Sequence, residues 1–165
     1  MSRVKLLVRL LNAPEGGETA VAMAARLCYS GANIDALREK VSAADQNAFI
    51  QRLAEMGHLS PIEHASFTFG IEGVSRSLLA QITRHRLASF SVQSQRYVDQ
   101  TKGGFSYILP PAVERLGPEY QARYEEQMQT IAAWYDEWVE ALGGGKESAR
   151  EDARFGLPNA AETKM

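Results

Sequence analysis

The sequence predicts an α+β fold, because stretches with the periodicity of amphipathic helices and stretches with the alternation of strands follow one another along the chain. The clearest helical stretch spans residues 118–142, and the clearest alternating stretch spans residues 67–71. The chain has 165 residues, of which 45% are hydrophobic and 23% charged, which is the balance of an ordinary globular protein. This length and composition fit one domain over residues 1–165.

The first strand and the first helix are predicted close to the N-terminus. Residues 4–11 (VKLLVRLL) form a short apolar run with the length of a strand. After a break at Gly16 and Gly17, residues 19–30 have the period of a helix that places Cys28 on its apolar face. Cys28 is the single cysteine, so an internal disulfide is ruled out, and its place in an apolar stripe argues against a catalytic thiol.

A second helix and a second strand follow. Ser42, with Asp45 three residues later, resembles a capping box and predicts a helix that runs to Met56 and ends at Gly57. Residues 67–71 then place apolar side chains at every second position, as in a half-buried strand.

The remaining elements are a short helix, a strand, a long helix and another short helix. Ser75 can cap the first of these helices, which runs into the sequence RHR. Residues 105–109 form a strand before two prolines, and residues 146–155 form the last helix. The long helix over 118–142 carries two tryptophans and three tyrosines, and so much aromatic surface predicts contact with another subunit.

The overall charge and the apolar runs exclude several classes of protein. The net charge of −2 argues against a chain that coats nucleic acid through bulk positive charge, so nucleic acid is not an expected partner. The apolar runs are broken every few residues and the N-terminus lacks an export signal, so no membrane segment is expected. A single cysteine fits a reducing compartment, and we expect the protein in the cytoplasm.

One window of the chain concentrates positive charge. No acidic residue lies between Glu72 and Asp99, whereas the window holds Arg76, Arg84, His85, Arg86 and Arg96. Its central part (QITRHRLASFSVQSQR) adds hydroxyl and amide side chains. Guanidinium groups suit phosphate, and hydroxyls and amides can orient a ring that has donors and acceptors. The window therefore indicates a site for a phosphorylated, ring-bearing ligand, and the alternative is a solvated helix end followed by a polar loop.

The order of residues in this window resembles a known family signature. Arg84-His85-Arg86, seven intervening residues, Ser94, one further residue and Arg96 are similar to the signature of flavin-dependent thymidylate synthases. The flanks agree with the family pattern at Gly57-His58, Pro61, Glu63-His64, Gln81, Ser89, Tyr97, Ala153-Arg154 and Leu157-Pro158. The resemblance covers most of the chain.

The resemblance implies a fold, an assembly and a reaction. The fold is a central antiparallel sheet flanked by helices, and the assembly is a homotetramer whose active sites are shared between subunits. The reaction is the reductive methylation of dUMP to dTMP, with methylenetetrahydrofolate as one-carbon donor, NADPH as reductant and FAD as hydride carrier. The family's catalytic arginine lies beyond the position of Met165, so the chain is expected to be truncated at its C-terminus.

The resemblance also implies roles for particular residues. Those expected to bind dUMP are Gln81, Ile82, Thr83, Arg84, Val92, Gln93, Ser94, Gln95, Arg96 and Arg154, and Glu151 stands one turn before Arg154. Those expected to bind FAD are Ser60, Arg84, His85, Arg86 and Val92. His58 is expected to support catalysis, and with Ser60 it lies on a turn that reaches the flavin and folate of a neighbouring subunit. If the chain is extended after Ser94, Ser94 and Arg96 face the same ligand.

Other interpretations of the same residues stay open. His58, Glu63, His64 and His85 could ligate a metal, but their spacing fits no helical pair, and no metal is expected. Ser94 has no base beside it in the sequence, so it is expected to bind and not to attack. A rival function is a binding module that holds phosphorylated ligands or RNA without catalysis. A third possibility is a scaffold whose site is completed by partner chains or a lost tail.

Overall fold

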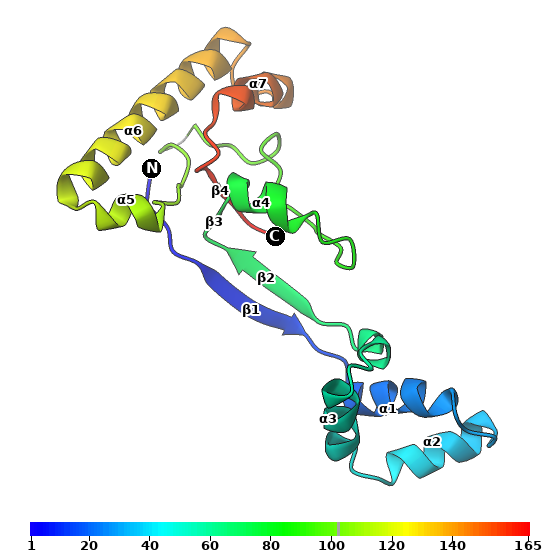
Figure 1. Cartoon of the computed structure of the whole chain (residues 1–165). Coiled ribbons are helices and arrows are strands. Elements are labelled where there is room, and N and C mark those ends of the chain that lie inside the picture. The colour runs from blue at the N-terminus through cyan, green and yellow to red at the C-terminus, as the bar shows by residue number, and fades with distance from the viewer. Residues whose placement is uncertain (102) are drawn as a thin grey trace. The chain divides into compact units, whose positions relative to one another are not determined.

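The computed structural model describes residues 1–101 and 103–165, which divide into two compact units (Figure 1). The helical unit is Leu10–Phe69, and the mixed unit combines Met1–Arg9 with Gly70–Met165. Helices and short antiparallel strands are both present, so the predicted α+β class is confirmed. The expectation that residues 1–165 form one domain stays a prediction.

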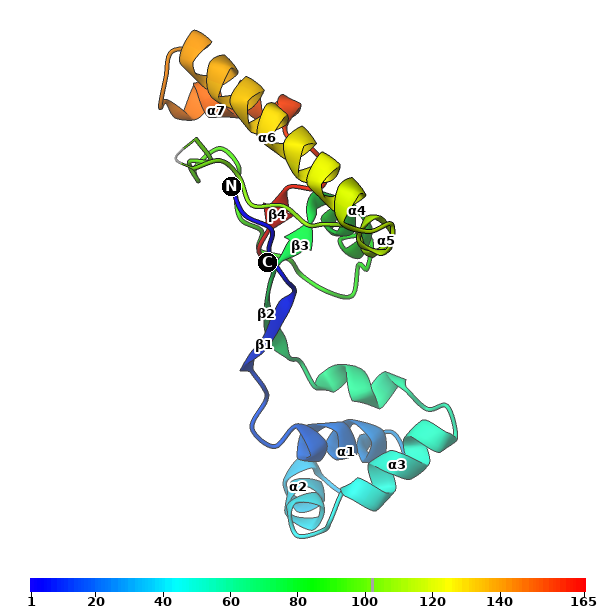
Figure 2. The ribbon, with the colours of Figure 1, turned by 90° about the vertical axis from the view of Figure 1, so that its left-hand side faces the viewer.

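Three short helices make up most of the helical unit. They are α1 (Gly17–Leu27), α2 (Ile34–Ser42) and α3 (Asn47–Glu55), followed by the 3-10 helix η1 (Ser60–His64), and Figures 1 and 2 show α1, α2 and α3 gathered together. Ala22, Leu37 and Val41 form their buried centre. The sequence analysis did not predict α2, which begins where the Asn33 side chain accepts a hydrogen bond from the Ala36 N–H at 2.9 Å.

The predicted capping box at Ser42 is wrong. Ser42 is the last residue of α2, because burial of Leu37 and Val41 extends that helix through it. The buried Gln46 side chain then donates to the Val41 carbonyl at 2.6 Å and fixes the turn into α3. The predicted helix end at Gly57 is confirmed, since Gly57 has a φ of 74° directly after α3.

The prediction that Cys28 lies in an apolar stripe is also wrong. Helix α1 ends at Leu27, and Cys28 is exposed just beyond it. The helix buries Val21, Ala22 and Ala25 instead. Cys28 caps α1 with helical dihedral angles and follows the stripe by spacing, but its side chain is exposed and is not part of the buried face.

The two strands predicted early in the sequence are confirmed and pair with each other. Strand β1 (Leu7–Asn12) and strand β2 (Thr68–Glu72) form a two-stranded sheet. All six residues of β1 are exposed, and Leu11 has 66% of its surface accessible. A strand this apolar and this exposed is a surface that another chain or segment can cover.

In the mixed unit, four short segments lie side by side. Tyr107 bridges Arg3 in a parallel sense and Ala161 in an antiparallel sense. Strand β4 (Glu162–Thr163), which follows Ala161, pairs antiparallel with strand β3 (Val74–Ser75). The predicted strand over residues 105–109 is therefore reduced to one bridge at Tyr107, although its alternate residues Phe105, Tyr107 and Leu109 are buried as a strand would bury them.

Gly73 is an extra residue that bends the edge of this sheet. Ile71 exchanges both backbone hydrogen bonds with Met165, and Val74 is opposite Thr163, so one strand has one residue more than its partner. This arrangement is a β-bulge, and Gly73 within it has a φ of 70°, which glycine adopts without the strain that a side chain would add. A Cβ here would also collide with the carbonyl of Lys5. The N-terminal segment can pass this close only over glycine.

The helices of the mixed unit begin and end near their predicted positions. They are α4 (Arg76–Ile82), α5 (Pro111–Arg115), α6 (Pro118–Ala141) and α7 (Glu147–Ala153), followed by the 3-10 helix η2 (Arg154–Gly156). The Ser75 cap is confirmed, because its hydroxyl accepts a hydrogen bond from the Leu78 N–H at 3.1 Å. Helix α7 packs against the C-terminal part of α6 (Figure 2). Only α5 was not predicted.

Helix α6 buries one face and exposes part of its aromatic surface. Met128 joins a cluster with Phe105, Tyr107 and Ala161, and Tyr135 and Val139 pack with Ala153 of α7. Trp134 and Trp138 are 58% and 57% exposed on the same helix. Among residues 1–101 and 103–165, no helix is both long enough and apolar enough to cross a membrane.

Candidate functional site

The arginine-rich segment begins where helix α4 ends. The N–H groups of Arg84 and His85 donate to the carbonyls of Gln81 and Ile82 at 3.1 and 3.0 Å, so the chain leaves the helix in tight turns. The Arg84 guanidinium also donates to the Gln81 side chain at 3.4 Å. Arg84 is thereby oriented toward the last turn of the helix.

An open hollow of about 400 Å³ lies at this helix end. Leu78 and Ile82 supply an apolar wall, whereas Gln81, Arg84 and His85 supply donors and positive charge. A flat ring with polar edges matches this combination of surfaces. Beyond the hollow, Arg86 and Leu87 are exposed, with Leu87 at 97%.

The second part of the segment, residues 92–96, is half-buried and is held by the sheet and by α4. The Gln93 N–H donates to the Lys164 carbonyl at 2.9 Å, and the Gln93 carbonyl accepts from the Arg76 guanidinium at 2.9 Å. Burial and the nearby charge of Arg154 lower the pKa of Arg76. Arg76 and Arg154 are therefore near neighbours of like charge.

The chain is not extended between Ser94 and Arg96. The Ser94 hydroxyl accepts a hydrogen bond from the Arg96 N–H at 3.2 Å, and the Ser94 carbonyl accepts from the Val98 N–H at 3.2 Å. These contacts close a turn, because a serine hydroxyl can cap the backbone two residues later. The extended geometry considered for this pair is wrong, although the turn still keeps the two residues adjacent.

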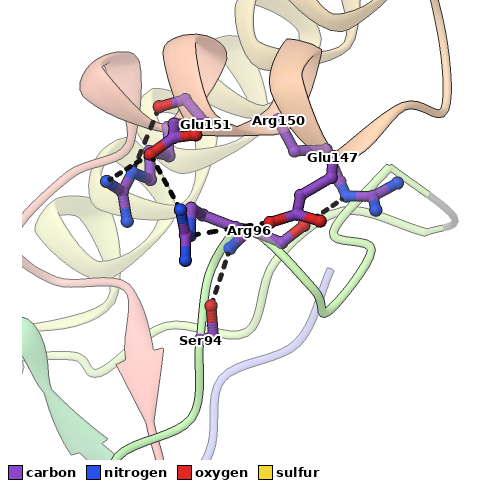
Figure 3. A network of polar contacts seen from close by, with 6 residues as sticks. Ser94, Arg96, Glu147, Arg150 and Glu151 are labelled. Carbon is purple, nitrogen blue, oxygen red and sulfur yellow. Dashed lines mark hydrogen bonds and ion pairs between the residues drawn. The ribbon is translucent and has the colours of Figure 1, made fainter.

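Arg96 sits at the centre of a network of polar contacts that joins the arginine-rich segment to helix α7 (Figure 3). One terminal nitrogen of its guanidinium contacts the Glu151 carboxylate at 3.1 Å, and its Nε lies 3.9 Å from the Glu147 carboxylate. The hydrogen bond and the charge of Glu151 raise the pKa of Arg96. The guanidinium also lies 5.3 Å from the centre of the Tyr97 ring.

Two further arginines of α7 and η2 complete the network. Arg150 donates from Nε to the Arg96 carbonyl at 2.7 Å and holds the backbone of that residue. Arg154 donates from Nε to the Glu151 carbonyl at 3.1 Å, and its terminal nitrogen lies 3.9 Å from the Glu151 carboxylate. One carboxylate, that of Glu151, thus faces both Arg96 and Arg154.

The structure brings some of the sequence-predicted site residues together and leaves others apart. Ser94, Arg96 and Arg154 meet in the network, although they come from segments more than fifty positions apart. Gln81, Ile82, Arg84 and His85 line the hollow, next to Thr83 at the end of α4. His58 and Ser60 are exposed residues of the helical unit.

The sequence analysis missed Glu147 and Arg150. Glu147, Glu151 and Arg154 follow one another at helical spacings of four and three, which place them on one face of α7 and of the η2 turn that continues it. This spacing was visible in the sequence and could have indicated the network. Within the described part of the chain, no group of three or more His, Cys, Asp or Glu residues could hold a metal ion.

Comparison with known proteins identifies the family. Residues 9–165 match the family described as thymidylate synthase complementing protein. The flavin-dependent thymidylate synthase of Geobacter sulfurreducens is 48% identical in an alignment of 162 positions that covers 96% of this chain and 66% of that protein. The enzyme of the same name from Clostridium tetani is 40% identical over 96% of this chain and 67% of its own length. This chain thus spans about two thirds of the length of these relatives.

The fold is similar to that of a solved methylase. A UMP/dUMP methylase from Streptomyces cacaoi, crystallised with 5-Br dUMP, superposes with a TM-score of 0.67 and 25% identity, over 99% of this chain and 72% of that one. The signature, its placement at the end of α4 and beside α7, and these relatives agree with one another. The chain belongs to the thymidylate synthase complementing protein family, whose members named above are flavin-dependent thymidylate synthases.

Proposed function

We propose that this chain binds dUMP and FAD and supplies the nucleotide-binding and flavin-binding parts of the active site of a flavin-dependent thymidylate synthase. The observation that carries the proposal is the contact of Arg96 with Glu151 and of Glu151 with Arg154. It joins the end of the signature to the second segment for which the resemblance implies dUMP binding. The reaction is the reductive methylation of dUMP to dTMP, with methylenetetrahydrofolate as one-carbon donor and NADPH as reductant.

The nucleotide phosphate is proposed to bind beside Ser94, Arg96 and Arg154. Two guanidiniums can neutralise a phosphate and hydrogen-bond to its oxygens. The Ser94 hydroxyl accepts a hydrogen bond from the Arg96 N–H, so its own proton is free to be donated to a phosphate oxygen. Gln93 and Gln95, half-buried on either side of Ser94, offer amides for the edges of the uracil ring. Val92 lacks a polar side chain, so a contact there uses its backbone.

The flavin is proposed to bind at the hollow at the end of α4. Its residues fit part of such a molecule, because Leu78 and Ile82 can pack against a ring while Arg84 and His85 donate to its polar groups. Arg86, exposed next to them, suits the FAD phosphates. When bound, FAD supplies the hydride chemistry that no side chain provides. Ser60, with His58 in support, is proposed to reach the flavin of a neighbouring subunit.

The flavin spectrum and the affinity for dUMP of the purified protein test this function. We expect the chain to retain FAD with its yellow absorbance and to bind dUMP in calorimetric titration. Deoxyuridine, which lacks the phosphate, is the matched ligand control and should bind much more weakly. Colourless protein that co-purifies with RNA and ignores dUMP would favour the rival function of an RNA-binding module instead.

Subunit association is proposed to use the exposed aromatic side chains of α6. Trp134 and Trp138 lie one helical turn apart and are both more than half exposed. Large apolar side chains in such an arrangement are typical of interfaces. We propose a homotetramer with shared active sites, in line with what the resemblance implies.

Charge placed on this face should break the assembly. We expect Trp138→Glu to lower the mass measured by light scattering at micromolar concentration, because a carboxylate buried without a partner in an interface is costly. Ala133→Glu is the control, since it adds the same charge at another exposed position of α6. Equal masses for Trp138→Glu and the unmodified protein would remove this face from the interface.

A further inference from the structure

The guanidinium of Arg96 is already paired with carboxylates. Glu151 contacts one of its terminal nitrogens at 3.1 Å, and Glu147 lies 3.9 Å from its Nε. Nε and the terminal nitrogens are the donors through which an arginine forms hydrogen bonds to a phosphate. A phosphate that binds Arg96 must therefore take the place of at least one carboxylate.

Glu151 is the carboxylate that an incoming anion can replace at both arginines. The same Glu151 oxygen that contacts Arg96 lies 3.9 Å from Arg154. The side chains of Arg96, Arg154 and Glu151 are 37%, 34% and 42% exposed, so solvent reaches the pair and exchange needs no opening of the core. Ion pairs this exposed are weak and can yield to a stronger anion.

The backbone of Arg96 is held independently of Glu151. Its N–H is held by the Ser94 hydroxyl, and its carbonyl is held by the Arg150 guanidinium at 2.7 Å. Its guanidinium lies over the Tyr97 ring. Glu151 therefore acts on the Arg96 guanidinium as its counter-charge and is not needed to place the backbone of that residue.

The surroundings favour an additional anion. Arg96 contacts Glu151 and lies near Glu147, Arg154 lies near Glu151, Arg150 donates to the Arg96 carbonyl, and Arg76 lies close to Arg154. The four arginines outnumber the two glutamates by two charges, and Asp99, whose charge acts on Tyr135 together with that of Arg150, offsets part of this excess. A nucleotide monophosphate carries about 1.5 to 2 negative charges at neutral pH and would balance this excess better than one carboxylate does.

We propose that Glu151 is the resident counter-anion of the nucleotide site, which holds Arg96 and Arg154 while the site is empty and gives up Arg96 to the phosphate when dUMP binds. The proposal rests on the proposed function, because it takes the ligand to be dUMP. Glu151 then lowers the affinity for dUMP, whose phosphate must displace it from Arg96, and does not affect nucleosides that lack a phosphate.

Calorimetric titration of the full chain with dUMP tests the exchange. In Glu151→Gln the amide keeps the shape but not the charge, so we expect dUMP to bind about three- to tenfold more tightly, the range that two exposed ion pairs give. Inorganic phosphate should compete more strongly in this variant as well. The affinity for deoxyuridine should not change.

The control variant is Asp152→Asn, which removes the same charge from the next residue of α7, where the side chain is exposed. Its affinity for dUMP should match that of the unmodified chain. Weaker dUMP binding by a folded Glu151→Gln would overturn the exchange and indicate that Glu151 positions the site. Unchanged binding would also overturn it and indicate that Glu151 has no role in nucleotide binding. Equal tightening by Asp152→Asn would also overturn it, because a general charge effect would then suffice. If the unmodified chain does not bind dUMP, the proposed function itself fails.

Discussion

Arg96→Ala is expected to weaken the binding of dUMP by roughly ten- to a hundredfold, because it removes a charge-assisted contact to the phosphate. FAD should stay bound, since none of the residues that line the proposed flavin hollow at the end of α4 belongs to the Arg96 network. The loss should be larger for dUMP than for deoxyuridine. Calorimetry measures the nucleotide affinity, and the absorbance of the purified protein measures retained flavin.

Arg86→Ala is the matched control, because it removes an exposed arginine of the same signature from the proposed flavin side. It should lower flavin retention and disturb the nucleotide only indirectly. Circular dichroism confirms that both variants are folded. If Arg96→Ala is folded and its affinity for dUMP is unchanged, the end of the signature is not the nucleotide site, whatever the family resemblance implies.

The second large effect is expected in the core of the mixed unit. Phe105 is 2% exposed and packs with Tyr107, Met128 and Ala161. Phe105→Ala should lower the free energy of unfolding by about 3–5 kcal/mol, because it removes apolar contacts and leaves a cavity. Urea denaturation followed by circular dichroism measures this change.

Phe155→Ala makes the same chemical change at a side chain that is 85% exposed. We expect it to alter the free energy of unfolding by less than about 0.5 kcal/mol. A comparable loss in both variants would contradict the packing described here and would indicate that Phe155 is covered by another subunit.

Local signals in the sequence were sufficient for α4 and α6 of the mixed unit, although not for α5. The apolar spacing over 118–142 predicted α6, which spans Pro118–Ala141, and Ser75 predicted the start of α4. Each of these signals is decided by neighbouring residues. The prediction of a capping box at Ser42 was wrong because neighbouring residues do not decide it. A capping residue cannot be told from the last residue of a preceding helix until the burial of Leu37 and Val41 is known.

The sequence was sufficient to predict which residues belong to the site, but not which of them contact one another. The signature placed Ser94 and Arg96 in one motif, and the resemblance added Arg154. That Arg96 is already paired with Glu151 depends on the packing of α7 near the turn at Ser94, which no local pattern encodes. The turn itself arises because the Ser94 hydroxyl bonds the Arg96 N–H, a contact that competes with an extended chain.

The division of the chain also has a consequence for the order of folding. The mixed unit is built from two stretches that flank Leu10–Phe69, and its bridge between Arg3 and Tyr107 spans more than half of the sequence. Pairings this distant form slowly, because the chain must close a large loop first. During synthesis the helical unit can fold while the N-terminal segment is still unpaired, because its partner residues are synthesised much later. The apolar residues of β1 follow that segment directly, so the nascent protein is most exposed to misassociation before Tyr107 and Ala161 arrive.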